Sequence, residues 1–284
     1  MGYQTIDVKP VSGGLGAELS GVDLSKPLDN QTFSDIYQAF NEHLVVFFRD
    51  QFLSPEQHRD FAARFHSLES HPFVEGIDGI PEIIKIVKEP DEVRNWGGPW
   101  HADVTFQKEP SVGAVLYARE VPKYGGDTLF ANTQLAYETL SSGMKSALEN
   151  LRAVHESGAP ERYANEKFKG MMARSGGQYT ENVHPVVRTH PDTGKKSLFV
   201  NAGFVRRFED MTVEESRPLL QYLFDHLIRP EFTCRFRWRE NSIAVWDNRA
   251  VLHHATDDDF QAKRTGKGFR RVLHRATLAG QAVH

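Results

Sequence analysis

The feature that most constrains the fold is residues 233–239, where apolar and polar side chains alternate strictly. In an extended chain Cys234, Phe236 and Trp238 point to one face, and Thr233 and three arginines point to the other. This period of two is typical of a strand with one face in a core and one in water. The chain must therefore build a sheet with one face covered.

Further β-branched and aromatic runs predict more strands. They lie at residues 44–48, 82–87, 113–118, 128–130, 197–201, 243–246 and 269–277. Apolar spacing and capping residues predict helices at residues 31–42, after the capping box of Ser54 and Gln57, after Asn132, after Ser141 or Ser142, and after the capping box of Thr212 and Glu215. Pro218 conflicts with a continuous helix there. This pattern predicts a mainly β fold, a sandwich or jelly roll with helices packed outside it.

Composition places the chain among soluble globular proteins, with 39% hydrophobic and 25% charged residues. A net charge of −4 argues against non-specific binding to nucleic acid, and no apolar run is long enough to span a membrane. The single cysteine, Cys234, excludes an intrachain disulfide, which fits a reducing compartment, and we expect a cytoplasmic protein. We find no linker and expect one domain over residues 1–284, with a lid or mobile segment at the polar residues 153–183.

The first candidate site lies in residues 100–106, Trp-His-Ala-Asp-Val-Thr-Phe. The β-branched and aromatic residues favour an extended chain, in which His101 and Asp103 share a face. Such a pair supplies two members of a 2-His-1-carboxylate triad, which leaves positions open on iron. A His-x-Asp pair taken alone is more typical of a surface hydrogen bond than of a metal site.

A third ligand is available in residues 245–254, where a strand and an Asp-Asn turn lead to His253 and His254. Either one is buried structurally and the other exposed, or one of them completes the triad. A ligating histidine needs a partner for its second ring nitrogen, and a nearby carboxylate such as Asp257 can supply it.

The last predicted strand places Arg271, Leu273 and Arg275 on one face. An arginine that points into a barrel is costly unless it meets an anion. That anion is either a protein carboxylate or a small-molecule acid.

Taken together, several motifs resemble the taurine dioxygenase family, which also contains phenoxyacetate dioxygenases and alkylsulfatases. They are His-Ala-Asp-Val-Thr-Phe at 101–106, Gly-Gly-Asp-Thr-Leu at 125–129, Trp-Asp-Asn-Arg at 246–249 followed by a histidine, Arg-Arg-Val-Leu-His-Arg-Ala-Thr at 270–277, and the segments 184–191 and 198–201. The resemblance implies a double-stranded β-helix that holds non-haem Fe(II). It also implies a reaction in which 2-oxoglutarate and O₂ yield succinate and CO₂ while a small organic acid is hydroxylated.

The resemblance also implies roles for individual residues. It makes His101, Asp103 and His253 the iron ligands, Thr128 and Arg271 the contacts of 2-oxoglutarate, and Arg275 a contact of both the keto-acid end and the substrate acid. His71 and the backbone N–H of Val104 are implied as further contacts of the substrate acid, with Phe106 and Phe204 as apolar walls.

Two assignments have competitors. The spacing from His253 to Arg271 is longer than is usual in the family, and Arg264 competes on spacing. We prefer Arg271 because residues 263–268 are polar, contain glycine and are predicted to be a loop. His254 competes with His253, but the spacing from Trp-Asp-Asn-Arg favours His253.

The positions that contact the taurine amine in the family's namesake are Tyr and Asn, whereas this chain has Val74 and Gly97. We therefore expect an alkyl sulfate, a sulfonate or an aryloxyalkanoate to be a better substrate than taurine, unless Asn95 or residues 153–183 supply the missing polarity.

Three alternatives remain at this stage. They are a taurine dioxygenase proper, a metal enzyme of another class on the same barrel such as a hydrolase, and a non-catalytic ligand-binding sandwich. The expected partner is a small organic acid, with no nucleic acid or membrane. Homo-oligomers are common among soluble proteins, and we expect one here.

Overall fold

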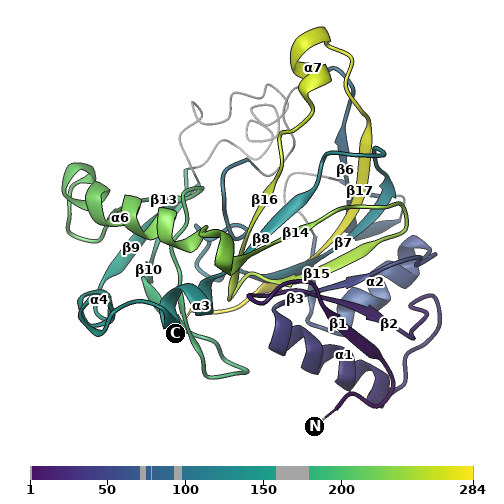
Figure 1. Cartoon of the computed structure of the whole chain (residues 1–284), viewed down its shortest axis with the longest axis horizontal. Coiled ribbons are helices and arrows are strands. Elements are labelled where there is room, and N and C mark those ends of the chain that lie inside the picture. The colour runs from purple at the N-terminus through teal and green to yellow at the C-terminus, as the bar shows by residue number, and fades with distance from the viewer. Residues whose placement is uncertain (1, 71–74, 78, 93–97, 158–178, 284) are drawn as a thin grey trace.

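The computed structural model describes residues 2–70, 75–77, 79–92, 98–157 and 179–283. Two sheets face each other at its centre, as Figure 1 shows; their strands pair antiparallel except β2 and β3 of the larger sheet, which pair parallel. The smaller sheet has the order β14 (Thr233–Phe236), β8 (Thr128–Asn132), β16 (Val251–Ala255). The larger has the order β1 (Asp7–Pro10), β2 (Ala17–Ser20), β3 (Val45–Phe48), β15 (Ile243–Asp247), β7 (Ser111–Glu120), β17 (Arg271–Gly280), β6 (Ile80–Lys88), β5 (Gly76–Ile77), and β4 (Leu68–Glu69) pairs with β17. The predicted jelly roll is confirmed.

The space between the two sheets is filled by the side chains that the alternating segment turns inward. Cys234, Phe236 and Trp238 are buried with Phe47 from the larger sheet, and the rings of Phe47 and Phe236 stack with centroids 4.0 Å apart. The arginines of the same segment are exposed. The strand ends at Phe236, although the alternation of burial continues to Arg239.

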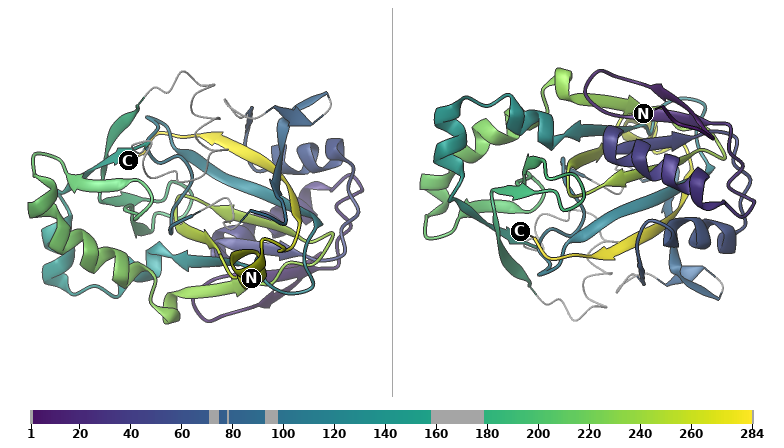
Figure 2. Two further views of the ribbon diagram at one scale, coloured as in Figure 1. Left: turned by 90° about the horizontal axis from the view of Figure 1, so that it is seen from above. Right: turned by 90° about the horizontal axis from the view of Figure 1, so that it is seen from below.

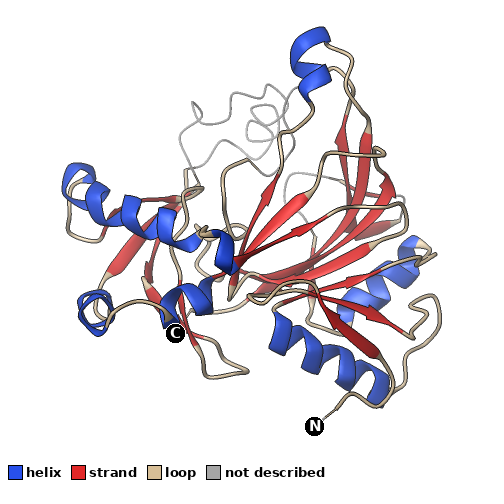
Figure 3. Cartoon of the chain, viewed as in Figure 1, coloured by secondary structure: helices blue, strands red, loops and turns tan. Residues whose placement is uncertain are grey.

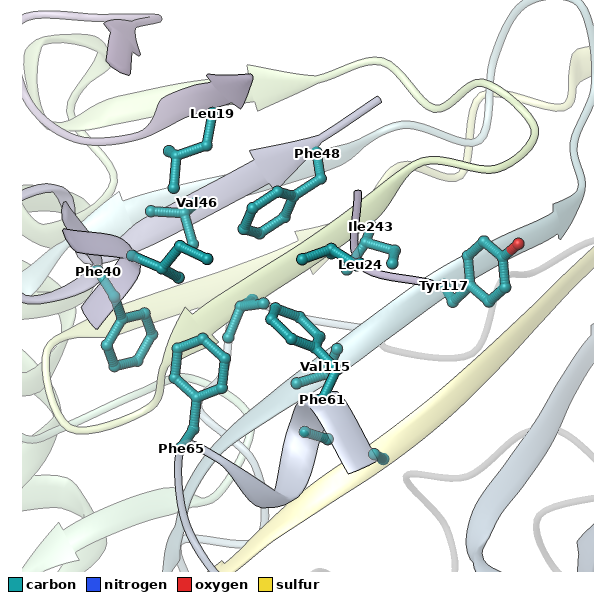
Figure 4. Close-up of a cluster of buried hydrophobic side chains, with 14 of the residues drawn as sticks. Leu19, Leu24, Phe40, Val46, Phe48, Phe61, Phe65, Val115, Tyr117 and Ile243 are labelled. Carbon is teal, nitrogen blue, oxygen red and sulfur yellow. The ribbon is translucent and has the colours of Figure 1, made fainter. Parts of the chain in front are cut away.

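Two helices cover the outer face of the larger sheet. Helix α1 (Asn30–His43) begins at the cap Asp29, and α2 (Pro55–Ala63) begins at Ser54 with the predicted capping box. Figure 4 shows Phe40 and Phe61 from these helices packed against Val46, Phe48 and Val115 of the sheet. This core stabilises the outer face of the larger sheet, which leaves the inner face, between the two sheets, available for a binding site.

A third layer lies beside the barrel and contains α6, as the secondary-structure colouring in Figure 3 makes clear. It comprises the sheet β10 (Glu181–Pro185), β9 (Arg152–Glu156), β13 (Val205–Phe208), the pair β11 (Val187–Thr189) and β12 (Lys196–Leu198), the helices α3 (Thr133–Glu138), α4 (Ser142–Leu148) and α6 (Val213–Leu227), and the 3₁₀ turn η2 (Pro230–Phe232). Figure 2 shows this layer at the opposite end of the molecule from α1 and α2.

One prediction about this layer needs correction, and one conflict in the sequence is resolved. The strand predicted at 197–201 ends at Leu198, because the next amide, that of Phe199, donates to Val186 outside the strand pair. Helix α6 continues through Pro218, which is exposed. The capping box of Thr212 and Glu215 opens this helix as predicted.

Most of the polar segment 153–183 lies outside the described residues, which include only its ends in β9 and β10. None of the described helices is long and apolar enough to span a bilayer.

Candidate metal and co-substrate site

His101, Asp103 and His253 come together between the sheets. Their ligand atoms all lie within 4.8 Å of one another, the only such cluster of potential metal ligands among the described residues. The backbones of His101 and His253 hold each other, because each N–H donates to the other's carbonyl at 3.1 and 2.8 Å. Strand β16 therefore carries His253 and pins His101 beside it.

The extended chain predicted for residues 101–106 is wrong. Only His101 makes a strand-like bridge, and Asp103 to Phe106 form a turn. The turn closes when the N–H of Gln107 donates to the carbonyl of Val104 at 2.9 Å. Asp103 still approaches the histidines, with Oδ1 at 3.9 Å from Nε2 of His101 and 3.6 Å from Nε2 of His253.

The carboxylate of Asp103 has one oxygen occupied and one available. Oδ2 accepts from Arg275 at 2.9 Å and from Nδ2 of Asn248 at 3.0 Å. Nε1 of Trp246 donates to Oδ1 of Asn248 at 3.0 Å, which fixes the amide with its NH₂ group toward Asp103. Oδ1 is thus left facing the two imidazoles as a single-oxygen ligand.

Burial and charge set the protonation of the three side chains. Burial lowers the pKa of His101, and it lowers the pKa of His253 to about 3, so both imidazoles are neutral near pH 7. For Asp103 burial acts to raise the pKa, but the Arg275 guanidinium, the two histidine rings and the hydrogen bond from Asn248 together outweigh this effect and hold the pKa below its usual value. The site presents two neutral rings and one anion.

The second ring nitrogens do not meet carboxylates, contrary to the sequence-based expectation. Nδ1 of His101 donates to the carbonyl of Pro99 at 2.8 Å, which leaves the Nε2 lone pair free. Nδ1 of His253 is buried without a hydrogen-bond partner. His254 is turned away from the cluster, with Nδ1 at 2.6 Å from the carbonyl of Gly98.

Arg271 and Thr128 lie near each other at the wall made by Trp238. Nε1 of Trp238 donates to Oγ1 of Thr128 at 3.0 Å, and the Arg271 guanidinium carbon lies 5.9 Å from the ring centroid. Arg271 is 5% exposed, its Nε has no partner, and it forms no ion pair with a described residue. Burial lowers its pKa to about 10, so it remains charged near pH 7.

Arg264 has a different environment. It lies in a short helix, α7 (Phe260–Thr265), rather than in the predicted loop, and its side chain is exposed. Gly126 lies directly against Arg271, because a Cβ on this glycine would be 3.4 Å from Cδ of Arg271. Its φ of +67° also favours glycine. The structure thus brings Arg271, and not Arg264, into the interior.

The residues expected around the substrate are described except for one. Phe106 and Phe204 pack edge to face with centroids 5.2 Å apart, and Phe204 lies 6.0 Å from the ring of His101. Val104 is in the turn between Asp103 and Phe106. His71 lies outside the described residues, as do Val74, Asn95 and Gly97.

The chain matches known proteins over nearly its whole length. The model of the "Taurine catabolism dioxygenase TauD, TfdA family" matches residues 7–277. The chain belongs to this family. It is 35% identical to an alkylsulfatase of Acinetobacter baylyi, with 99% of this chain and 87% of the relative covered. It is 34% identical to an alpha-ketoglutarate-dependent sulfate ester dioxygenase of Pseudomonas putida, with 97% and 90% covered. The crystal structure of a taurine dioxygenase from Burkholderia xenovorans is 38% identical, with a TM-score of 0.84 and 99% and 91% covered.

As a member of the family, this dioxygenase uses Fe(II), 2-oxoglutarate and O₂. Its residues fit that use on chemical grounds. Two neutral imidazoles and one carboxylate form the facial donor set of non-haem Fe(II) enzymes. The unpartnered guanidinium of Arg271 is a suitable contact for a carboxylate.

Two parts of the dioxygenase site were not assigned from the sequence. Asn248 orients Asp103, and Trp238 joins Thr128 to Arg271. A signal existed for Asn248, since it lies in the Trp-Asp-Asn-Arg motif that precedes His253. Trp238 gave no signal beyond its place on the inward face of the alternating segment.

Proposed function

We propose that the protein oxidises a small organic acid, with an alkyl sulfate ester as the first candidate and sulfonates and aryloxyalkanoates as further ones. His101, Asp103 and His253 would hold the iron, and Thr128 and Arg271 would bind 2-oxoglutarate. The observation that carries this proposal is the buried Arg271, which has no ion pair with a described residue and lies on the strand whose Arg275 contacts Asp103 of the triad.

When bound, iron with 2-oxoglutarate and O₂ supplies the oxidation that replaces a substrate C–H bond by C–OH. On the carbon beside a sulfate ester the product collapses, so RCH₂OSO₃⁻ with 2-oxoglutarate and O₂ gives RCHO, hydrogen sulfate, succinate and CO₂. The chain's own part is to orient the acid and exclude water.

Five groups would position the organic acid. Arg275, the Val104 N–H and, outside the described residues, His71 are suited to an anionic head group. Phe106 and Phe204 would pack on the carbon chain. Arg275 also bonds Asp103, so it would place the acid beside the metal ligands.

The test is a substrate panel of hexyl sulfate, hexanesulfonate, 2-phenoxypropionate and taurine, assayed for succinate with and without Fe(II). Fe(II)-dependent succinate formation with hexyl sulfate, together with sulfate release, supports the proposal. Taurine giving the highest kcat/KM would favour a taurine dioxygenase proper. Sulfate release without 2-oxoglutarate would indicate a hydrolase.

We further propose that the protein is a single-domain, cytoplasmic homo-oligomer that binds neither nucleic acid nor membranes. Cys234 is the single cysteine of the chain, so no intrachain disulfide can form, which supports a reducing compartment. Light scattering after size-exclusion chromatography tests the assembly, and a monomer would contradict it.

A further inference from the structure

Val104 adopts a backbone conformation that its side chain disfavours. Its φ is +43°, in the left-handed region. Four other described non-glycine residues have positive φ, namely Leu44, Asp50, Asp210 and Asn241, and none of these is β-branched. A valine in this region requires surrounding structure that imposes it, and such residues concentrate at functional sites.

The next residue is held from two sides. Thr105 is fully buried, and its hydroxyl lies 2.9 Å from Nδ1 of His155 and 3.2 Å from Nδ2 of Asn201. His155 lies on β9, 50 residues away along the chain, and Asn201 follows β12, 96 residues away. Both partners are 1% exposed or less. Neither they nor Thr105 have a role in the reaction described above.

The side-chain amide of Asn201 also holds the turn that carries Phe204. Oδ1 of Asn201 accepts from the N–H of Phe204 at 2.9 Å. Gly203 lets this turn approach the metal site, because a Cβ there would lie 2.9 Å from Cβ of His101. Asn201 therefore connects the turn that carries Val104 and Phe106 to the turn that carries Phe204.

The third layer also contacts the C-terminal end of the turn that carries Val104. Nδ2 of Asn182 donates to the carbonyl of Phe106 at 2.8 Å, and Nε2 of His184 lies 2.9 Å from the carbonyl of Gln107. Both residues are on β10, next to β9. The sheet outside the jelly roll thus supports the turn along its length.

We propose that Thr105, His155 and Asn201 form a buried bracket whose task is to hold Val104 in its left-handed conformation and to fix Phe106 against Phe204. These are positioning residues. Through them the outer sheet sets the affinity for the organic acid and its placement beside the iron. The inference rests on the proposed function in one respect, the use of the Val104 N–H and the two rings as the substrate surface.

Thr105, His155 and Asn201 hold the turns that carry the proposed substrate surface, and the prediction follows from their separation from the proposed 2-oxoglutarate contacts. Arg271 and Thr128, which would bind 2-oxoglutarate, lie against Trp238 and, among the described residues, make no hydrogen bond with Thr105, His155 or Asn201. Losing the Thr105 hydroxyl should therefore weaken the organic acid and leave 2-oxoglutarate affinity unchanged. A residue needed only for folding would weaken both or neither.

A matched pair of variants tests this. Thr105→Val keeps the branched shape and removes the hydroxyl, whereas Thr105→Ser keeps the hydroxyl. With hexyl sulfate as the probe, we expect Thr105→Val to raise KM about tenfold, as for loss of a buried hydrogen bond. More succinate should form per sulfate released, since a misplaced acid is missed by the oxidation. The Kd of 2-oxoglutarate, from anaerobic tryptophan fluorescence, should change by less than about twofold, and Thr105→Ser should resemble the wild type.

Equal KM for Thr105→Val and wild type, or equal weakening of hexyl sulfate and 2-oxoglutarate, overturns the bracket. A crystal structure of Thr105→Val gives an answer that does not depend on activity, because Val104 should leave the left-handed region and its retention there refutes the inference. If Thr105→Val does not fold, His155→Phe keeps the ring and removes the Nδ1 contact, and the same expectations apply. Wild-type protein without Fe(II)-dependent succinate formation refutes the proposed function instead.

Discussion

Among single residues, the adjacent histidines 253 and 254 differ in what their rings contact. The ring of His253 lies 4.3 Å from that of His101, whereas His254 donates to the carbonyl of Gly98 and packs at a tilt against the ring of Trp100. We expect His253→Ala to abolish Fe(II)-dependent succinate formation and His254→Ala to retain much of it. An inactive His254→Ala beside an active His253→Ala would reverse the ligand assignment.

Asn248 orients the carboxylate of Asp103, the proposed metal ligand, without being a ligand itself. Its amide donates to Asp103 and is itself fixed by the indole of Trp246. Removing such an outer partner lowers metal affinity by about 10- to 100-fold. We expect this loss for Asn248→Ala, measured by anaerobic calorimetry with Fe(II), while Asn30→Ala on the surface of α1 serves as the control. Wild-type affinity in Asn248→Ala would show that Arg275 alone orients the carboxylate.

Arg271 is suited to a two-pronged contact with a carboxylate. Its planar guanidinium offers parallel donors that a lysine ammonium lacks. We expect Arg271→Lys to weaken 2-oxoglutarate binding by about 10- to 100-fold, which corresponds to a charge-assisted hydrogen bond of about 1.5–3 kcal/mol. Arg264→Ala, at an exposed position, should bind 2-oxoglutarate as the wild type does. Equal losses at the two positions would contradict the choice of Arg271.

Among helices and strands, the sequence predicted correctly those whose ends or faces are determined by neighbouring residues, such as capping boxes. The capping boxes at Ser54 and Thr212 opened helices where expected, and the alternating segment placed Phe236 and Trp238 in the core. The turn at 103–106 was missed because Thr105 is fixed by residues 50 and 96 positions away, which outweigh its β propensity. For the same reason Asn248, 145 positions from Asp103, had no predicted role.

Residues 256–270, which join β16 to β17 and include α7, explain the long spacing from His253 to Arg271. We call this segment the excursion. A buried ion pair fastens it, with Nζ of Lys88 2.8 Å from Oδ2 of Asp259 and both side chains at most 4% exposed. The same oxygen accepts from the N–H of Phe269, two residues before Arg271. The excursion thus leads the chain to Arg271 in a fixed position.

Breaking this pair should be costly, because it leaves a buried charge without its partner. We expect Lys88→Met to lower the free energy of unfolding by about 3–5 kcal/mol. Lys26→Met removes an exposed pair with Asp23 and should cost much less, because water screens that pair. Urea titrations of both variants give the comparison. A similar small loss in both would mean that the apolar stem of the methionine compensates for the missing charge.

For the whole molecule, buried histidines make the fold sensitive to acid. Burial lowers the pKa of His58 to about 3 and puts the pKa of His155 well below its usual value. In the unfolded chain both titrate near 6.5, so below that pH the unfolded state binds more protons and stability falls. The pKa of Asp247 is also low, because Arg249 and His190 outweigh the effect of burial, and its contribution is lost only below about pH 4.

We therefore expect these two histidines to lower the free energy of unfolding between pH 6 and pH 4 by up to about 2.7 kcal/mol per pH unit, since each neutral buried histidine contributes at most about 1.4. His58→Leu should reduce that slope by about 1.4 kcal/mol per pH unit, because the leucine binds no proton in either state. Urea titrations at pH 7, 6, 5 and 4 measure both slopes. If His58→Leu keeps the wild-type slope, then His58 takes up its proton in the folded protein. That result would contradict the lowering of its pKa by burial.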